Sequence, residues 1–355
     1  MTEARGDFRR SAGVLCAMAS LATAAGSPGC SRAEETPGRT SASSTGGTEA
    51  GTSAGSGTGG EGGTGGGGSY VIAPLAPALP FDATPDPGGA HVYFTGVDEH
   101  GTAGVFKARL HGEARSTEVA VGAPFVAPLG IATSTDGGRL FVADPGAGSA
   151  PLADAGGLFA IDLAGGAVAP VPGGEGLHAR GLEVARGPSG EDQIVVAGRD
   201  PEDGQPGVFA LPARGGVAAA IAKGSPLVDP SGVAVAGDGD VFICDTLASP
   251  DRTATIFRIE DGFVSPVVAG LHVGYPCGIA LTLDGAALLV LTRDVVRGAG
   301  EIARIELSSG ARSRIDAGAA GRDEPGGMHR AKGADVFAFA DRDAQGKGSV
   351  FLLRR

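Results

Sequence analysis

Short apolar runs separated by glycine- and aspartate-rich turns follow one another from residue 70 to the end of the chain. In the stretch PSGVAVAGDGDVFICD, residues 230–245, the runs VAV and VFI flank the letters GDGD. Asp and Gly tolerate the backbone angles of a tight hairpin, so this stretch predicts two antiparallel strands. Gly and Pro, at 64 and 23 of 355 residues, punctuate the chain too often for long helices.

The same two-strand pattern recurs along the chain with a nearly constant period. Clear copies are PLGIATSTDGGRLFVAD (128–144) and PCGIALTLDGAALLVLT (276–292), and three weaker copies lie at 80–96, 179–198 and 325–340. A fixed period of 46–51 residues matches the length of a propeller blade. The positions that anchor this period are Pro80, Gly130, Gly181, Gly232, Gly278 and Gly326.

A third strand follows each copy, as in GLFAIDLAGG (157–166), and a fourth follows five of the six copies. The sixth copy lacks a fourth strand because the chain ends at Arg355, whereas SYVIAPLAP (69–77) is a spare strand before the first copy. Residues 69–77 should therefore complete the last blade and remove an open sheet edge. We predict an all-β, six-bladed β-propeller over 70–355, with four-stranded antiparallel blades; a seventh, unrecognised blade is the alternative.

The turn between the first two strands holds a different residue in each copy. A position that accepts Ser and Lys is not a column of ion ligands, and the distal Glu of a calcium-binding EF-hand is missing. The acids of this turn are therefore interpreted as turn formers. The residues in this column are Asp86, Asp136, Ser189, Asp238, Asp284 and Lys332.

The stretch DPSGVAVAGDGDVFICD resembles an NHL-type repeat, in which Pro-x-Gly and an apolar run precede a Gly turn and a second apolar strand ending in Asp. Six such blades are also similar to the gluconolactonase-like and strictosidine-synthase-like propellers. The resemblance covers 70–355 and implies the propeller fold. Those families differ in function, so the resemblance does not specify a reaction.

The first thirty residues have the pattern of an export signal. Arg9 and Arg10 precede an apolar run, 12–25, that is too short to span a membrane. The letters SPGC resemble the bacterial lipoprotein signal, which implies lipidation of Cys30; ordinary cleavage near ATAAGS is the alternative. Residues 31–69 contain no apolar side chain larger than Ala in their Gly/Ser/Thr-rich part, so we expect a flexible linker.

The composition restricts the set of partners. The net charge is −12 and no basic patch appears, which argues against a nucleic-acid partner. We expect a monomer that contacts the membrane only through a lipid anchor, as an outer-membrane, periplasmic or cell-surface bacterial protein. Its partner would be a protein or a small ligand at one face of the propeller.

Charged residues follow the second strand of several blades and should gather around one mouth of the central channel. Such a ring is the default ligand-binding hypothesis. The alternative is that these side chains bind loops of neighbouring blades or one another. The candidates are Asp144, Arg199, Asp245, Arg293 and Asp341.

The resemblance also implies candidate metal ligands. Gluconolactonase-like enzymes hold a divalent cation with Glu, Asn and Asp, and this chain has no Asn. Some NHL-type lyases bind zinc through three channel histidines, which implies His178, His272 and His329 here, although their offsets from the repeat differ. No cofactor is predicted, and a divalent cation in the central channel is the minor alternative.

Cys244 and Cys277 are the two cysteines of the repeat region. Cys244 ends the second strand of the fourth blade, and Cys277 immediately precedes the first strand of the fifth, so both should lie at the same mouth. An exported protein can form disulfides, which predicts a Cys244–Cys277 bridge, with two separate thiols as the alternative. The leading functional hypothesis is a non-enzymatic binding module at the cell envelope; the alternative is a metal-dependent lactonase, esterase or lyase acting in the channel.

Overall fold

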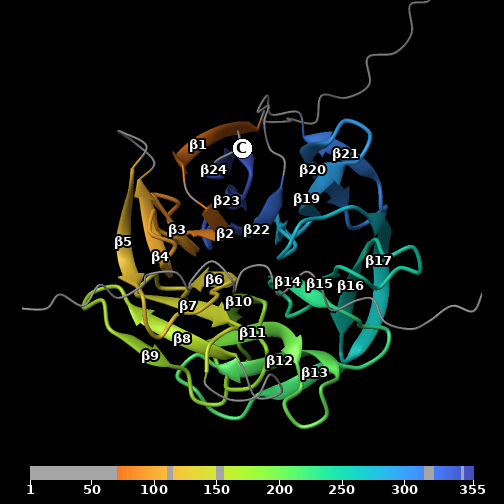
Figure 1. The fold of residues 1–355 in the computed structure, drawn as a ribbon. Coiled ribbons are helices and arrows are strands. Elements are labelled where there is room, and N and C mark those ends of the chain that lie inside the picture. Colours follow the sequence, from red (N-terminus) through yellow and green to blue (C-terminus); the bar gives the residue numbers. More distant parts are fainter. Residues whose placement is uncertain (1–69, 78, 110–114, 149–155, 316–323, 345–347) are drawn as a thin grey trace, which may run out of the picture. The chain divides into compact units, whose positions relative to one another are not determined.

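Twenty-four strands form six four-stranded antiparallel sheets arranged around a central axis (Figure 1). The computed structural model describes residues 70–77, 79–109, 115–148, 156–315, 324–344 and 348–355. No α-helix occurs within these ranges, and no helix there is long and apolar enough to cross a membrane. The expected signal peptide (1–30), the linker (31–69) and Cys30 lie outside the described residues.

The first three blades are built from consecutive strands, listed here from the channel outward. Blade 1 contains β2 (Leu79–Pro85), β3 (His91–Val97), β4 (Ala103–Arg109) and β5 (Ser116–Val121). Blade 2 contains β6 (Gly130–Thr133), β7 (Arg139–Asp144), β8 (Gly157–Asp162) and β9 (Val168–Pro170). Blade 3 contains β10 (Gly181–Arg186), β11 (Asp192–Arg199), β12 (Pro206–Pro212) and β13 (Ala219–Lys223).

The last three blades repeat this order with one exchange. Blade 4 contains β14 (Pro230–Val235), β15 (Val241–Asp245), β16 (Ala254–Glu260) and β17 (Phe263–Leu271). Blade 5 contains β18 (Ile279–Leu281), β19 (Ala287–Asp294), β20 (Ala299–Glu306) and β21 (Arg312–Ile315). Blade 6 contains β22 (Pro325–Arg330), β23 (Val336–Asp341) and β24 (Ser349–Arg354), with β1 (Val71–Pro77) as its outer strand.

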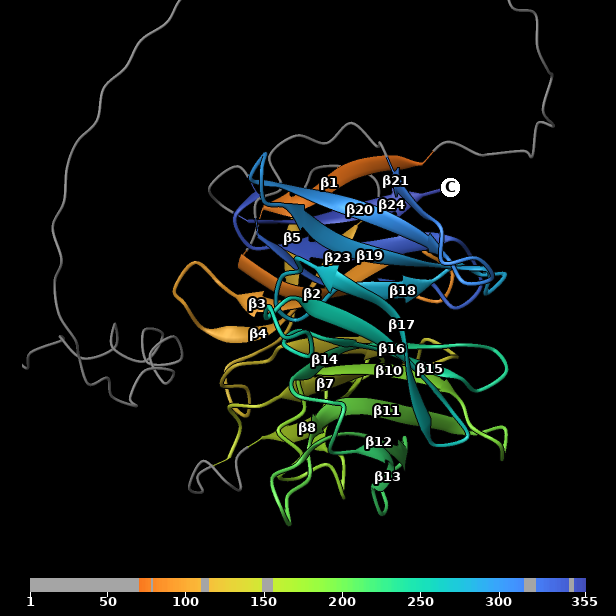
Figure 2. The same ribbon diagram turned by 90° about the vertical axis from the view of Figure 1, so that its right-hand side faces the viewer.

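The N-terminal strand closes the ring, as the sequence predicts. β1 pairs antiparallel with β24, from Val71 opposite Arg354 to Pro77 opposite Ser349. The two chain segments therefore meet in one sheet, and the outer edge of β24 is covered (Figure 2). The six-bladed prediction is confirmed.

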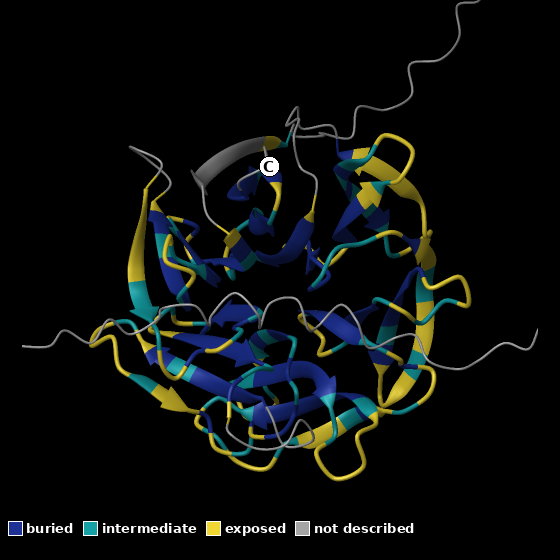
Figure 3. Ribbon diagram, in the orientation of Figure 1, coloured by how far each residue is buried: buried dark blue, intermediate teal, exposed yellow. Residues whose placement is uncertain are grey.

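Burial follows the position of each strand in its blade (Figure 3). The inner strand β14 is buried along almost its whole length, whereas the outer strands β13 and β17 are mostly exposed. The apolar core lies between neighbouring blades: Phe242 and Cys244 of blade 4 pack with Ile279 and Leu288 of blade 5. Clusters of this kind join every pair of neighbouring blades, so each blade stabilises the next.

The recurring glycine of the inner strand has a steric cause. A Cβ on Gly181 would lie 1.9 Å from the Ser231 carbonyl oxygen, and one on Gly232 would lie 2.2 Å from that of Cys277. Inner strands of adjacent blades approach so closely near the axis that only glycine fits. The close packing of the inner strands around the channel thus explains the recurring glycine of the repeat.

Candidate functional site

The propeller has two faces that differ in which loops form them. The mouth face, as we call it, is formed by the loops that follow each second strand and by the loops that join successive blades. The turn face is formed by the hairpins between the first and second strands of each blade. The five predicted ligand-binding residues all lie at or near the ends of second strands, on the mouth face.

Three of the predicted ligand residues bind the loops that join the preceding blade to their own. The Asp144 carboxylate accepts hydrogen bonds from the amides of Val126 and Ala127, at 2.8 and 3.0 Å. Asp245 and Asp341 accept amide hydrogen bonds in the same way in blades 4 and 6. All three side chains are buried, and burial raises the pKa of Asp144 and of Asp245 against the opposing effect of these donors. These hydrogen bonds give the three carboxylates a structural role; their contact with a ligand stays a prediction.

The two predicted arginines differ in their environment. Arg199 donates from Nη1 to the Gly204 carbonyl oxygen at 3.0 Å and so supports the loop that follows its own strand. Arg293 is exposed, and only its backbone is fixed, by the amide that donates to the His272 carbonyl oxygen at 2.8 Å. Of the five predicted residues, Arg293 lines a cavity on the mouth face.

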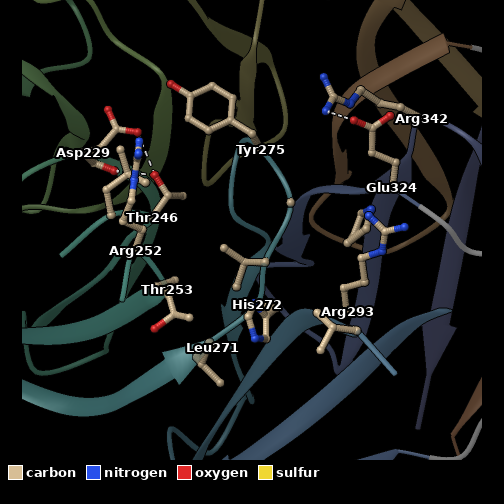
Figure 4. Close-up of a pocket in the computed structure, with 16 residues that line it drawn as sticks. Asp229, Thr246, Arg252, Thr253, Leu271, His272, Tyr275, Arg293, Glu324 and Arg342 are labelled. Carbon is tan, nitrogen blue, oxygen red and sulfur yellow. Dashed lines mark hydrogen bonds and ion pairs between the residues drawn. The ribbon is translucent and has the colours of Figure 1, made fainter. Parts of the chain in front are cut away.

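That cavity, which we call the mouth pocket, has a volume of about 510 Å³ and lies between blades 4, 5 and 6 (Figure 4). Its size falls in the range of pockets that bind small molecules. Polar side chains of three blades converge on it, and the sequence analysis named two of them, Arg293 and His272. The polar residues that line it are Asp229, Thr246, Arg252, Thr253, His272, Tyr275, Arg293, Glu324 and Arg342.

The acids of the mouth pocket already have partners. Asp229 forms an ion pair with Arg180 and accepts a hydrogen bond from the Thr246 hydroxyl at 2.7 Å. Glu324 forms an ion pair with Arg342 (Figure 4). Loops between blades vary in sequence from one repeat to the next, so no periodic signal could have identified these residues.

A buried ionic cluster lies between inner strands at the central axis. His329 on β22 places Nε2 3.0 Å from Oδ2 of Asp82 on β2, and Nδ1 3.1 Å from Oε2 of Glu183 on β10. Lys332, which follows β22, forms an ion pair with Glu183 and donates to the Val184 carbonyl oxygen at 2.7 Å. Two acids and two bases of blades 1, 3 and 6 thus neutralise one another at the axis.

The cluster shifts the pKa values of its members strongly. Burial alone would lower the pKa of His329, but the carboxylates of Asp82 and Glu183 outweigh it and raise the pKa to about 10. Burial alone would raise the pKa of Glu183, but Lys332 and His329 lower it to about 2. At neutral pH the imidazole is a cation that donates both of its N–H groups.

Sequence reasoning missed three of the four cluster residues. Asp82 and Glu183 are acids inside largely apolar inner strands, and that interruption was the available signal. Lys332 lies in a turn, as interpreted, and its ammonium group also binds Glu183, which the sequence did not indicate. The proximity of blade 3 to blade 6 across the axis could not be derived from the repeat alone.

The three histidines of the zinc hypothesis do not meet. His329 lies in the channel with both ring nitrogens bound, His272 lines the mouth pocket, and His178 lies in the loop before β10. Within the described ranges, no group of three or more His, Cys, Asp or Glu side chains could hold a metal ion. The three-histidine site is therefore corrected to three separate positions.

The predicted bridge between blades 4 and 5 is present. Cys244 and Cys277 form a disulfide with their Cα atoms 6.1 Å apart. Both residues are buried in the core between the two blades. The Ser231 hydroxyl accepts a hydrogen bond from the Cys277 amide at 3.2 Å, which further ties blade 5 to blade 4.

A second cavity, of about 670 Å³, opens on the turn face. Its central charges are already bound: Lys332 to Glu183, and Arg330 to the Leu281 carbonyl oxygen at 2.8 Å. A small space of about 10 Å³ lies beside His329, between inner strands of the channel. The ionic cluster borders both this space and the turn-face cavity.

Comparison with known proteins shows the fold. No family model matches the chain, and no curated protein matches its sequence. A gluconolactonase from Xanthomonas campestris has a similar structure, with TM-score 0.56, 17% identity, and coverage of 80% of this chain and 89% of that one.

Two further structures extend the comparison. A Thermus thermophilus protein named as an oxidoreductase (glucose dehydrogenase) has TM-score 0.53, 12% identity, and coverage of 80% of this chain and 100% of that one. A chain of a nidogen/laminin complex has TM-score 0.51, 16% identity, and coverage of 66% of this chain and 78% of that one. These structures share the propeller with this chain and differ among themselves in function, so the likeness shows the fold alone.

Proposed function

We propose that this chain is a non-enzymatic binding module that uses its mouth face, and that it is exported and held at the cell envelope by a lipid on Cys30. The observation that carries the proposal is the difference between the central channel and its mouth. In the channel, Asp82, Glu183, His329 and Lys332 neutralise one another, whereas the mouth holds an open pocket of about 510 Å³. Ligands bind where polar groups converge on open space.

Exposed apolar side chains occur on both faces. Val217, Phe263 and Leu283 lie at hairpins of the turn face, and five others lie on the mouth face, in loops before first strands or after second strands. The five on the mouth face and their exposed fractions are Val126 (58%), Val228 (44%), Leu247 (38%), Val295 (60%) and Val296 (92%).

The alternative function is a metal-dependent lactonase, esterase or lyase, which the structural likeness to a gluconolactonase keeps under consideration. The chain has no Asn for the ligand set that such enzymes use. The inner-strand acids Asp82 and Glu183 are each bound to His329. A cation in the channel would have to displace these ion pairs, which favours the binding module.

Metal analysis of the purified full chain, combined with a screen against lactones and esters, separates the two functions. The binding module predicts no stoichiometric Ca²⁺ or Zn²⁺ and no turnover. One bound divalent cation per chain together with turnover, lost on Asp82→Asn, would establish the enzyme instead.

The proposed location and membrane attachment are tested separately because Cys30 and the export signal are independent of the propeller. Cys30→Ser should move the protein from the membrane fraction to the soluble fraction of the cell envelope. The matched control is Cys16→Ser, which changes the other cysteine of the first thirty residues and should leave the distribution unchanged. Membrane association that persists in Cys30→Ser would refute lipidation at that residue.

A further inference from the structure

We propose that the mouth pocket binds a small molecule carrying two anionic groups, held by Arg252 on one side and Arg293 on the other. This inference rests on the proposed function, since it names the class of ligand that the mouth face binds. The ligand class is defined by its carboxylate or phosphate oxygens, which guanidinium groups bind with paired hydrogen bonds.

The charge in the pocket is positive once its ion pairs are counted. Asp229 is paired with Arg180, which lies outside the pocket lining, and Glu324 is paired with Arg342. Arg252 and Arg293 form no ion pair within the described part of the chain. Two unpaired cations therefore face the pocket in a chain whose net charge is −12.

The two arginines belong to different blades and lie on opposite sides of the pocket (Figure 4). Arg252 belongs to the loop between β15 and β16 and has a positive φ of 61°, which is uncommon for a residue other than glycine. Its amide donates to the Ser249 carbonyl oxygen at 2.8 Å, so the loop holds the Arg252 backbone in that conformation. Unfavourable backbone angles persist where surrounding bonds impose them, and they are frequent at binding sites.

The Arg293 backbone is held with similar firmness on the other side. Its amide donates to the His272 carbonyl oxygen at 2.8 Å, and it pairs with Gly300 across β19 and β20. Both cationic side chains thus extend from fixed backbone positions. A fixed backbone removes part of the entropy cost of binding a ligand between them, and the exposed side chains are ordered when the ligand binds.

The pocket floor strengthens the expected interaction with anions. Ala254 and Leu271 are buried apolar residues of blade 4 that line the pocket. A charged hydrogen bond next to an apolar, poorly solvated wall is stronger than the same bond in water. Thr253 and His272 add neutral polar groups that can bind other oxygens of the ligand.

Tyrosine fluorescence offers a direct readout of this pocket. The chain has no Trp and three Tyr, and one of these, Tyr275, lines the pocket with its ring 5.9 Å from the Arg180 guanidinium carbon. Titrating the full chain with citrate or pyrophosphate at constant ionic strength should change the emission saturably. Acetate, with one charge, should bind at least about tenfold more weakly, and glucose should give no change.

Variants identify the groups responsible. Arg252→Gln and Arg293→Gln should each raise the dissociation constant for citrate about tenfold or more, which is the effect of losing one charge-assisted hydrogen bond. Arg139→Gln removes the same charge from an exposed position near a turn-face hairpin and should leave the constant unchanged. Tyr275→Phe should remove the fluorescence response while calorimetry still detects binding.

The outcomes separate this inference from the proposed function. No saturable response to citrate or pyrophosphate, or equal binding by Arg293→Gln and the unaltered protein, would overturn the anion class. Saturable binding of glucose that ignores both arginine variants would also overturn it, yet would leave a binding module with a neutral ligand. Metal-dependent turnover of a lactone would instead overturn the proposed function.

Discussion

His329 of blade 6 and Glu183 of blade 3 meet across the central channel, with imidazole Nδ1 3.1 Å from carboxylate Oε2. In a ring of six blades these two blades are opposite each other. The other ring nitrogen binds Asp82 of blade 1. One side chain thus connects three inner strands and obstructs the axis, which is why ligand chemistry is expected at the mouth.

Loss of the channel imidazole should destabilise the propeller. His329→Gln leaves Asp82 and Glu183 without their shared cation, and breaking a buried ion pair typically costs about 3–5 kcal/mol. Urea unfolding at about pH 6 measures this change. The matched control is His272→Gln at the exposed mouth position, for which we expect a change below about 0.5 kcal/mol.

The same cluster predicts a pH dependence with a definite sign. The pKa of His329 is raised to about 10 in the folded chain from an ordinary 6.5, so its contribution is complete below about pH 6.5 and is lost as the pH rises towards 10. The pKa of Glu183 is lowered from 4.5 to about 2, so its contribution is complete above about pH 4.5 and is lost as the pH falls towards 2.

These two contributions together are largest between about pH 4.5 and 6.5. Above that window, the difference in free energy of unfolding between the unaltered protein and His329→Gln should shrink by about 1.4 kcal/mol per pH unit. Urea unfolding of both proteins at about pH 6 and about pH 9 tests this. A difference that stays constant over that interval would show that His329 does not hold its proton in the folded chain.

The disulfide should stabilise the contact between blades 4 and 5. Cys244 and Cys277 are 33 residues apart, and closing a loop of that length stabilises a fold by about 3–4 kcal/mol in the chain-entropy account. Denaturant unfolding should show this loss in Cys244→Ala/Cys277→Ala. Reduction should lower the stability of the unaltered protein and leave the double variant unaffected; equal stability of the oxidised and reduced forms would contradict the prediction.

Removal of the closing strand should open the ring. Deleting 71–77 exposes the edge of β24 and removes the outer strand of blade 6, so we expect a large loss of thermal stability and a tendency to aggregate. The matched control deletes the same number of residues, 51–57, from the Gly-rich segment before the propeller. If both deletions leave the melting temperature unchanged, closure by β1 does not stabilise the ring.

The inner-strand glycines should not tolerate a methyl group. Gly232→Ala would place Cβ 2.2 Å from the Cys277 carbonyl oxygen, so the blades must separate and several kcal/mol of stability should be lost, in the range of severe overpacking. Gly237→Ala is the control, since no atom lies within 4 Å of its added Cβ. Equal melting temperatures for the two variants would refute close approach as the reason for the repeated glycine.

The repeat period allowed the architecture to be predicted because every blade packs against its neighbours in the same way. Alternating apolar residues, hairpin acids and the glycine at Gly232 and its equivalents recur for that reason. The Cys244–Cys277 bridge followed from the positions of two strand ends. Asp144 and its equivalents share a position in the repeat because they share a structural task, the binding of loop amides.

The mouth pocket could not be predicted in the same way. Arg252 and Tyr275 lie in loops that are not repeated, and only the ring geometry brings them together with Arg293. Lys332 occupies a turn position in the repeat but reaches across the channel to Glu183. The residues of the mouth pocket do not recur from blade to blade, so the repeat period does not identify them.

Hydrogen exchange of the full chain with and without saturating citrate tests the central claim, that ligands bind at the mouth and not in the channel. We expect slower exchange in the mouth-pocket segments 246–254 and 271–275, and unchanged exchange in 183–186 and 328–332 around the ionic cluster. Arg252→Gln/Arg293→Gln should abolish the protection. Protection confined to the channel and turn-face segments, with the mouth segments unchanged, would contradict the account.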